Sequence, residues 1–141
     1  MKILYVTDLH GDKEKYRKAL ELAIEKEISV IVNGGDMLPK LGERHLEQPE
    51  FINGFLRDYF GELQENNISY LTMLGNDDLL TVDALFEAVC GEFENVHNIA
   101  GKKICVGGYE IIGMNHILDH PFGCKDRVIT ETRYVPQRQL S

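Results

Sequence analysis

The chain of 141 residues lacks several features that would place it in common functional classes. It has no tryptophan, and no apolar run approaches the roughly 18 residues that suggest a membrane-spanning helix. Basic residues are in the minority, 15 against 23 acidic ones, and the net charge of −8 argues against a dedicated nucleic-acid surface. The cysteines number only three and lack metal-type spacing, so we expect a reduced, cytoplasmic location.

Three sequence signatures of widespread enzyme classes are also missing. No Gly-x-x-x-x-Gly-Lys-Ser/Thr or Gly-x-Gly-x-x-Gly pattern occurs, which excludes the usual P-loop and dinucleotide-binding sites. The absence of Gly-x-Ser-x-Gly argues against a hydrolase with a nucleophile elbow. The hydrophobic content of 43% is that of an ordinary globular protein, and the length favours a single domain over residues 1–141.

Strand-forming runs alternate with helical periodicity in the first ninety residues, and short strands follow. The sequence therefore predicts an α/β fold, βαβαβα followed by a β-meander, with a loop-like tail from about residue 115. Expected strands cover 2–7, 28–32, 69–74, 96–99, 104–106 and 109–112, and expected helices run from Asp12 to Ile24, from Pro49 to Leu63 and from Thr81 to Cys90.

A short acidic motif stands at the end of each of the first three expected strands. These motifs are Asp8-Leu9-His10, Gly34-Gly35-Asp36 and Gly75-Asn76-Asp77-Asp78. Because right-handed βαβ crossovers bring the carboxyl ends of parallel strands together, we expect these side chains to converge. Carboxylate, imidazole and carboxamide groups suit a pair of divalent cations. A capping Asp and a surface His would often produce one such motif, so the interpretation depends on all three occurring in order.

The ordered set resembles the calcineurin-like metallophosphoesterase superfamily, whose motifs run Asp-x-His, Gly-Asp and Gly-Asn-His-Asp/Glu before two later His motifs. The resemblance covers residues 1–80 with specific motifs and implies the N-terminal part of that family's α/β sandwich. It also implies two divalent metal ions (Mn, Fe, Zn, Ni or Co), with Asp8 and His10 binding one ion, Asp36 bridging both and Asn76 binding the second. The implied activity is hydrolysis of a phosphate mono- or diester by a metal-bridging hydroxide.

The sequence departs from the family pattern in two places. Asp77 stands where the family has a His beside the scissile phosphate, and Asp78 matches the acid that orients that His. We assign both a candidate catalytic role, with capping of the next turn as the alternative for Asp78. The later Gly-His and Gly-His-x-His motifs are absent, and His116 and His120 are the candidates to replace them. Each metal ion would otherwise have only two or three protein ligands, which indicates an incomplete domain with impaired activity.

Two other functions are compatible with the same residues. One is a phosphoesterase-like domain that has lost catalysis and serves in protein–protein interaction. The other is a metal-free α/β domain whose strand-end acids only cap helices. For the enzyme, the expected substrate is a phosphate-ester small molecule or a nucleotide, and no membrane partner is expected. A largely missing second sheet would leave an exposed face that a second copy of the chain could cover.

Overall fold

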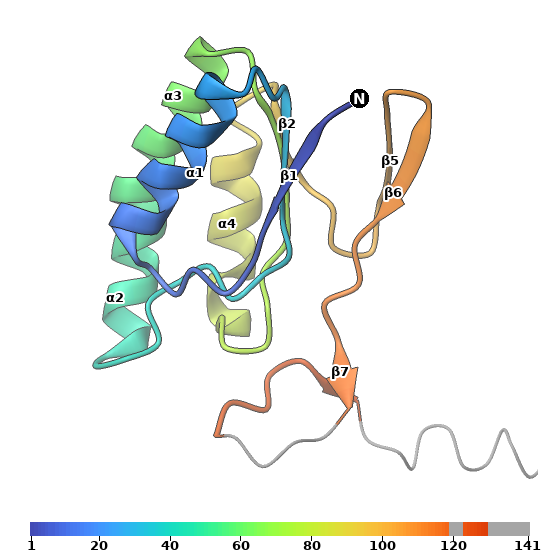
Figure 1. The fold of residues 1–141 in the computed structure, drawn as a ribbon. Helices are drawn as coiled ribbons and strands as arrows, with labels where there is room; N and C mark the ends of the chain where they lie inside the picture. The colour runs from blue at the N-terminus through green and yellow to red at the C-terminus, as the bar shows by residue number, and fades with distance from the viewer. Residues whose placement is uncertain (119–122, 130–141) are drawn as a thin grey trace, which may run out of the picture.

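A four-stranded parallel sheet forms the centre of the computed structural model, which describes residues 1–118 and 123–129 (Figure 1). The strand order is β1-β2-β3-β4, so each crossover places the next strand beside the previous one. In the register of the sheet, Val6, Asn33 and Thr72 lie side by side at the carboxyl ends of the first three strands. The strands are β1 (Ile3–Val6), β2 (Val30–Asn33), β3 (Ser69–Thr72) and β4 (Val96–Asn98).

The predicted α/β class is confirmed, and one strand lies in a different place from the prediction. The sequence pattern groups Val96–Asn98 with a meander, but β4 pairs in parallel with β3 after the crossover through α4 (Asp83–Cys90). Three residues cannot reveal their pairing direction, and the buried Val96 fixes it by packing under the helices. The expected hairpin is present, with β5 (Lys103–Val106) and β6 (Tyr109–Ile112) joined through Gly107 and Gly108.

The helices lie on one face of the sheet (Figure 1). The carboxylate of Asp12 caps α1 (Lys13–Glu25) by accepting hydrogen bonds from the backbone amides of Glu14 and Lys15. The second helical segment is continuous through α2 (Arg44–Phe51), the π-helical turn η1 (Ile52–Leu56) and α3 (Arg57–Glu65). A short 3₁₀ turn, η2 (Leu80–Val82), precedes α4.

The prediction that the second helix starts at Pro49 is wrong, because α2 begins at Arg44 and contains the proline. Proline lacks the N–H that would bond the carbonyl four residues earlier, so its place inside a helix costs one hydrogen bond. The preceding residue, Gln48, is fully buried, and its side-chain amide donates to the carbonyl oxygens of Pro39 and Asp77. These tertiary contacts hold the chain in helical geometry before the proline.

Apolar side chains form two clusters, one on each side of the sheet. The larger cluster lies between the sheet and the helices, and the smaller one joins Val30, Leu71 and Ile99 to the hairpin β5–β6. The hairpin leaves β1 uncovered, so Ile3 and Tyr5 are 42% and 62% exposed. That a second copy of the chain covers this exposed face of the sheet stays a prediction.

The last described segment runs along the carboxyl end of the sheet. It contains the short parallel pair β7 (Ile117–Leu118) and β8 (Val128–Ile129), which the sequence pattern did not predict. Among the described residues, no helix has the length and apolarity needed to cross a membrane.

Candidate metal centre

The loops that follow β1 and β2 are joined side by side by backbone hydrogen bonds. The amides of Asp8, His10 and Gly11 donate to the carbonyls of Gly35, Asp36 and Met37 at 2.8–3.0 Å. This ladder continues the sheet beyond its last paired residues. The functional side chains of the two loops are therefore fixed relative to each other by main-chain contacts.

Three residues of this ladder have an unusual backbone conformation. Asp8, His10 and Asp36 have φ angles of 57°, 46° and 51°, in the left-handed region that residues with a Cβ rarely adopt. Each such residue costs about 1–3 kcal/mol and persists only where the surrounding contacts enforce it. Here the left-handed backbone conformation directs three side chains of types that can bind metal ions toward a common point.

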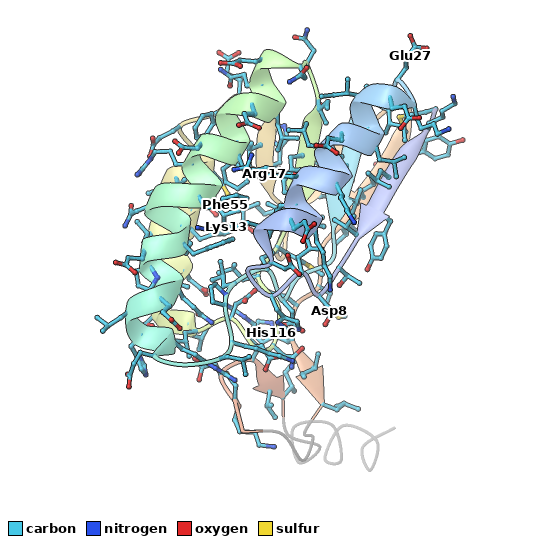
Figure 2. The ribbon with its side chains drawn as sticks, turned by 60° about the vertical axis from the view of Figure 1, so that its left-hand side comes forward. Asp8, Lys13, Arg17, Glu27, Phe55 and His116 are labelled. Atoms are coloured by element: carbon cyan, nitrogen blue, oxygen red, sulfur yellow. The ribbon has the colours of Figure 1, made fainter. Side chains whose placement is uncertain are left out.

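The side chains of Asp8, His10 and Asp36 form a compact cluster. One potential ligand atom from each lies within 4.8 Å of the other two. The Nε2 atom of His10 is 3.6 Å from Oδ1 of Asp8, whose other oxygen accepts the hydroxyl of Thr7 at 2.8 Å. Asp8 stands at the end of the sheet, next to the start of α1 (Figure 2). Among the described residues, this is the one group of three or more His, Cys, Asp and Glu side chains arranged to hold a metal ion.

The chemistry of this cluster fits a divalent cation. Asp36 is only 8% exposed, and burial, followed by the nearby Asp8 carboxyl, raises its pKa. A cation between the two carboxylates would remove this unfavourable interaction. The Nδ1 atom of His10 is buried and has no hydrogen-bond partner in the structure, while Nε2 on the other side of the ring faces Asp8. One imidazole and two carboxylates form a donor set that suits divalent transition-metal ions.

The loop after β3 brings the third motif to the same place. Asn76 and Asp77 line a pocket of about 490 Å³ together with Asp8, His10 and Asp36. The backbone amide of Asp77 donates to Oδ1 of Asp36 at 2.7 Å, which fixes one oxygen of the central carboxylate. Asn76 thus lines the same pocket as Asp8, His10 and Asp36 from a third loop, and its role as a metal ligand stays a prediction.

Asp78 is not among the described residues that line this pocket. Its carboxyl group instead holds two loops together. It is fully buried and accepts hydrogen bonds from the backbone amides of Met37, Leu38 and Gly75 at 2.8–3.1 Å. These contacts place it between the loops that carry Asp36 and Asn76. The geometry therefore favours a positioning role for Asp78, whereas Asp77 lines the pocket and its catalytic role stays a prediction.

Gly75 is required by the close approach of these two loops. A Cβ atom at this position would collide with the backbone nitrogen and Oδ1 of Asp36. Gly35, with φ of 113°, lies against it from the other loop, where a Cβ would come within 2.9 Å of the Cα of Gly75. The two glycines thus set the spacing between the second and third motifs.

Two supporting residues could not be found from motifs. Gln48 contacts the third loop, where its side chain accepts the amide of Leu79 and donates to the carbonyl of Asp77. Arg127 is 2% exposed, donates to the carbonyl of Gly75 at 2.8 Å and forms a two-point ion pair with Asp83. The sequence alone does not indicate these contacts, because the partner residues lie 29 to 52 positions away along the chain.

The two candidate replacement ligands have different outcomes. His116 is exposed and is not among the described residues that line the pocket. Its neighbour Asn115 does reach the third loop, where its side chain donates a hydrogen bond to the carbonyl of Leu74 at 2.9 Å. His116 is labelled in Figure 2 near the end of the sheet that carries Asp8. His120 lies outside the described residues.

Comparison with known proteins decides the family. The model of the calcineurin-like phosphoesterases matches residues 1–133 of this chain. The chain belongs to this family. The resemblance noted from the three motifs is thereby confirmed, and the family is one of phosphoesterases. No curated protein matches the chain in sequence.

Solved structures agree on the fold. The protein TT1561 of Thermus thermophilus is 17% identical, with a TM-score of 0.62, and another solved chain is 20% identical, with a TM-score of 0.63. Each alignment covers 98% of this chain and 62% of the other. The chain therefore spans less than two thirds of the length of these two structures.

Proposed function

We propose that this chain binds two divalent metal ions through Asp8, His10, Asp36 and Asn76 and hydrolyses phosphate esters. The observation that carries the proposal is the convergence of Asp8, His10 and Asp36, whose ligand atoms lie within 4.8 Å of one another in strained backbone positions. Membership of the calcineurin-like family supports the reaction class.

Each residue has a distinct part in this proposal. Divalent cations at the site would lower the pKa of a coordinated water and neutralise charge on the phosphoryl oxygens. Asp36 would hold both ions, because it is the most buried of the three and is hydrogen-bonded to the loops that carry His10 and Asn76. Asp77 lines the pocket, and it could give a proton to a leaving group there only when it is itself protonated.

We expect low turnover from residues 1–141. The four proposed ligands supply two or three protein donors for each ion, fewer than the four or more that a stable site of this kind takes. Missing ligands lower both metal affinity and the precision of the geometry. Robust Mn²⁺-stimulated hydrolysis of bis(p-nitrophenyl) phosphate by this chain would contradict the expectation of impairment and would promote His116 and His120 to candidate ligands.

Metal titration of two carboxylate variants tests the bridging role. Asp36→Asn should weaken the binding of both Mn²⁺ ions, whereas Asp8→Asn should mainly weaken one. Asp58→Asn on the exposed face of α3 removes the same charge away from the pocket and serves as the control. If Asp36→Asn and Asp8→Asn each lose a single Mn²⁺ ion, Asp36 does not bridge the two ions. Two bound ions without any phosphodiester hydrolysis, even in a longer version of the chain, would favour the alternative of an inactive interaction domain.

A further inference from the structure

Two basic residues complete the rim of the metal pocket. Lys40 and Arg44 line it together with the acidic cluster, and both come from the segment between β2 and the first turn of α2. Neither belongs to the three motifs. On a chain with a net charge of −8, these two residues add positive charge beside the proposed metal site.

The charged groups of these two residues form no ion pair within the described part of the protein. The Nε atom of Arg44 donates to the carbonyl of Lys40 at 2.8 Å, which orients the guanidinium. Within residues 1–118 and 123–129, neither the Lys40 ammonium nor the terminal nitrogens of Arg44 form an ion pair, although Glu43 and Glu47 flank Arg44 in sequence. By contrast, Lys13 and Arg17 each lie 5.7 Å from the centre of the Phe55 ring (Figure 2).

The size of the pocket decides what the cations would bind. About 490 Å³ is far more than one phosphate group fills, and it lies in the range of pockets that hold whole small molecules. The acidic cluster would engage the scissile phosphate through metal ions. A guanidinium fork whose terminal nitrogens form no ion pair with the described residues matches two phosphate oxygens, and the Lys40 ammonium adds a point charge to the same pocket.

We infer that Lys40 and Arg44 form a subsite for a second phosphate group, so that the substrates are small molecules with two neighbouring phosphates, such as pyrophosphate-linked nucleotides. This inference rests on the proposed function, because the first phosphate is placed by metal ions at Asp8 and Asp36. Lys40 and Arg44 determine specificity and take no part in the bond cleavage.

Binding of inorganic pyrophosphate and of orthophosphate to the Mn²⁺-loaded chain tests the subsite. Calorimetric titrations are made in one metal buffer that fixes free Mn²⁺, so complexation of the ion by the probe affects all variants equally. Lys40→Met/Arg44→Met should raise the Kd for pyrophosphate at least about tenfold and change the Kd for orthophosphate less than about threefold. Arg44→Lys should raise the Kd for pyrophosphate by less than the double variant does, because lysine keeps the positive charge and loses the two-pronged guanidinium. Lys18→Met/Lys26→Met removes two charges from α1 and its end and should leave both affinities unchanged.

The outcomes separate this inference from the proposed function. Failure of the wild-type chain to bind Mn²⁺ would refute the proposed function and the subsite with it. Normal Mn²⁺ binding with pyrophosphate affinity unchanged in the double variant would refute the subsite alone. An equal loss of affinity for pyrophosphate and for orthophosphate in the double variant would also refute the subsite, because Lys40 and Arg44 would then contact the scissile phosphate. Retained Mn²⁺ affinity in the double variant shows that the pocket is still folded.

Discussion

The spacing between the second and third motif loops offers a sharp test of the site, because one methyl group should disturb it. At Gly75 a Cβ would overlap the backbone nitrogen and Oδ1 of Asp36, and the φ angle of this glycine lies outside the left-handed region. Gly75→Ala therefore adds a steric conflict without backbone strain. The loop must move, and three short hydrogen bonds depend on its position.

These bonds set the magnitude of the effect. Asp77 N–H donates to Asp36 at 2.7 Å, Gly75 N–H donates to Asp78 at 2.8 Å, and Arg127 donates to the Gly75 carbonyl at 2.8 Å. The bonds made by Asp36 and Arg127 involve charged groups and are worth about 1.5–3 kcal/mol each, whereas the bond to a protonated Asp78 is worth about 0.5–1.5 kcal/mol. Loss of one or two of them should lower the free energy of unfolding by about 2–5 kcal/mol. Mn²⁺ affinity should fall with it, since the carboxylate of Asp36 is displaced.

Gly54→Ala is the matched control for this substitution. Gly54 lies in the helical turn η1, and a Cβ there would meet no atom within 4 Å. Alanine should therefore stabilise the protein by about 0.5–1 kcal/mol through its helix propensity. Urea unfolding followed by circular dichroism, together with Mn²⁺ titration, measures both variants. A Gly75→Ala variant as stable as wild type, with unchanged Mn²⁺ affinity, would show that the loops are not in the described contact.

Three further perturbations address single residues. Burial raises the pKa of Asp78 to about 7, so the folded protein keeps a proton that the unfolded chain releases near pH 4. In the metal-free protein the free energy of unfolding should fall as the pH rises from about 4 to 7, by up to about 1.4 kcal/mol per pH unit, and Asp78→Asn should flatten this slope in urea titrations. Arg127→Met should cost about 1–3 kcal/mol in the same assay, whereas Asp83→Asn should cost less, because its partner keeps the bond to the Gly75 carbonyl. In an active form of the enzyme, Asp77→His should raise kcat/KM within the roughly 10²–10⁴-fold range of a general acid; an unchanged rate in both Asp77→His and Asp77→Ala would exclude a role in the reaction.

The convergence of the first two motifs could be predicted because it depends on strand order and direction alone. Apolar strand runs with crossover helices place Asp8, His10 and Asp36 at the same sheet edge, and the structure brings them within 4.8 Å. The left-handed φ angles that aim these side chains could not be located from the sequence, since Asp and His adopt this conformation more often than most residues but still only occasionally.

The remaining features depend on contacts between distant residues. Gln48 fixes the start of α2 through loops 9 to 31 positions away, which overrides the boundary that Pro49 suggests. Arg127 supports the third loop from a segment where periodicity has faded. The direction of β4 likewise follows from packing against α4, because a three-residue strand carries no pattern of its own. Such contacts become visible only when the chain is folded.

The proposed site requires Asp36 to hold two metal ions at the carboxyl ends of β1, β2 and β3. A crystal structure of the Mn²⁺-loaded chain, with an anomalous difference map recorded at the manganese absorption edge, can show whether it does. We expect two anomalous peaks about 3.5–4 Å apart, with Asp36 contacting both, Asp8 and His10 contacting one and Asn76 contacting the other. A single peak, or a pair of peaks in which Asp36 contacts only one ion, would contradict it.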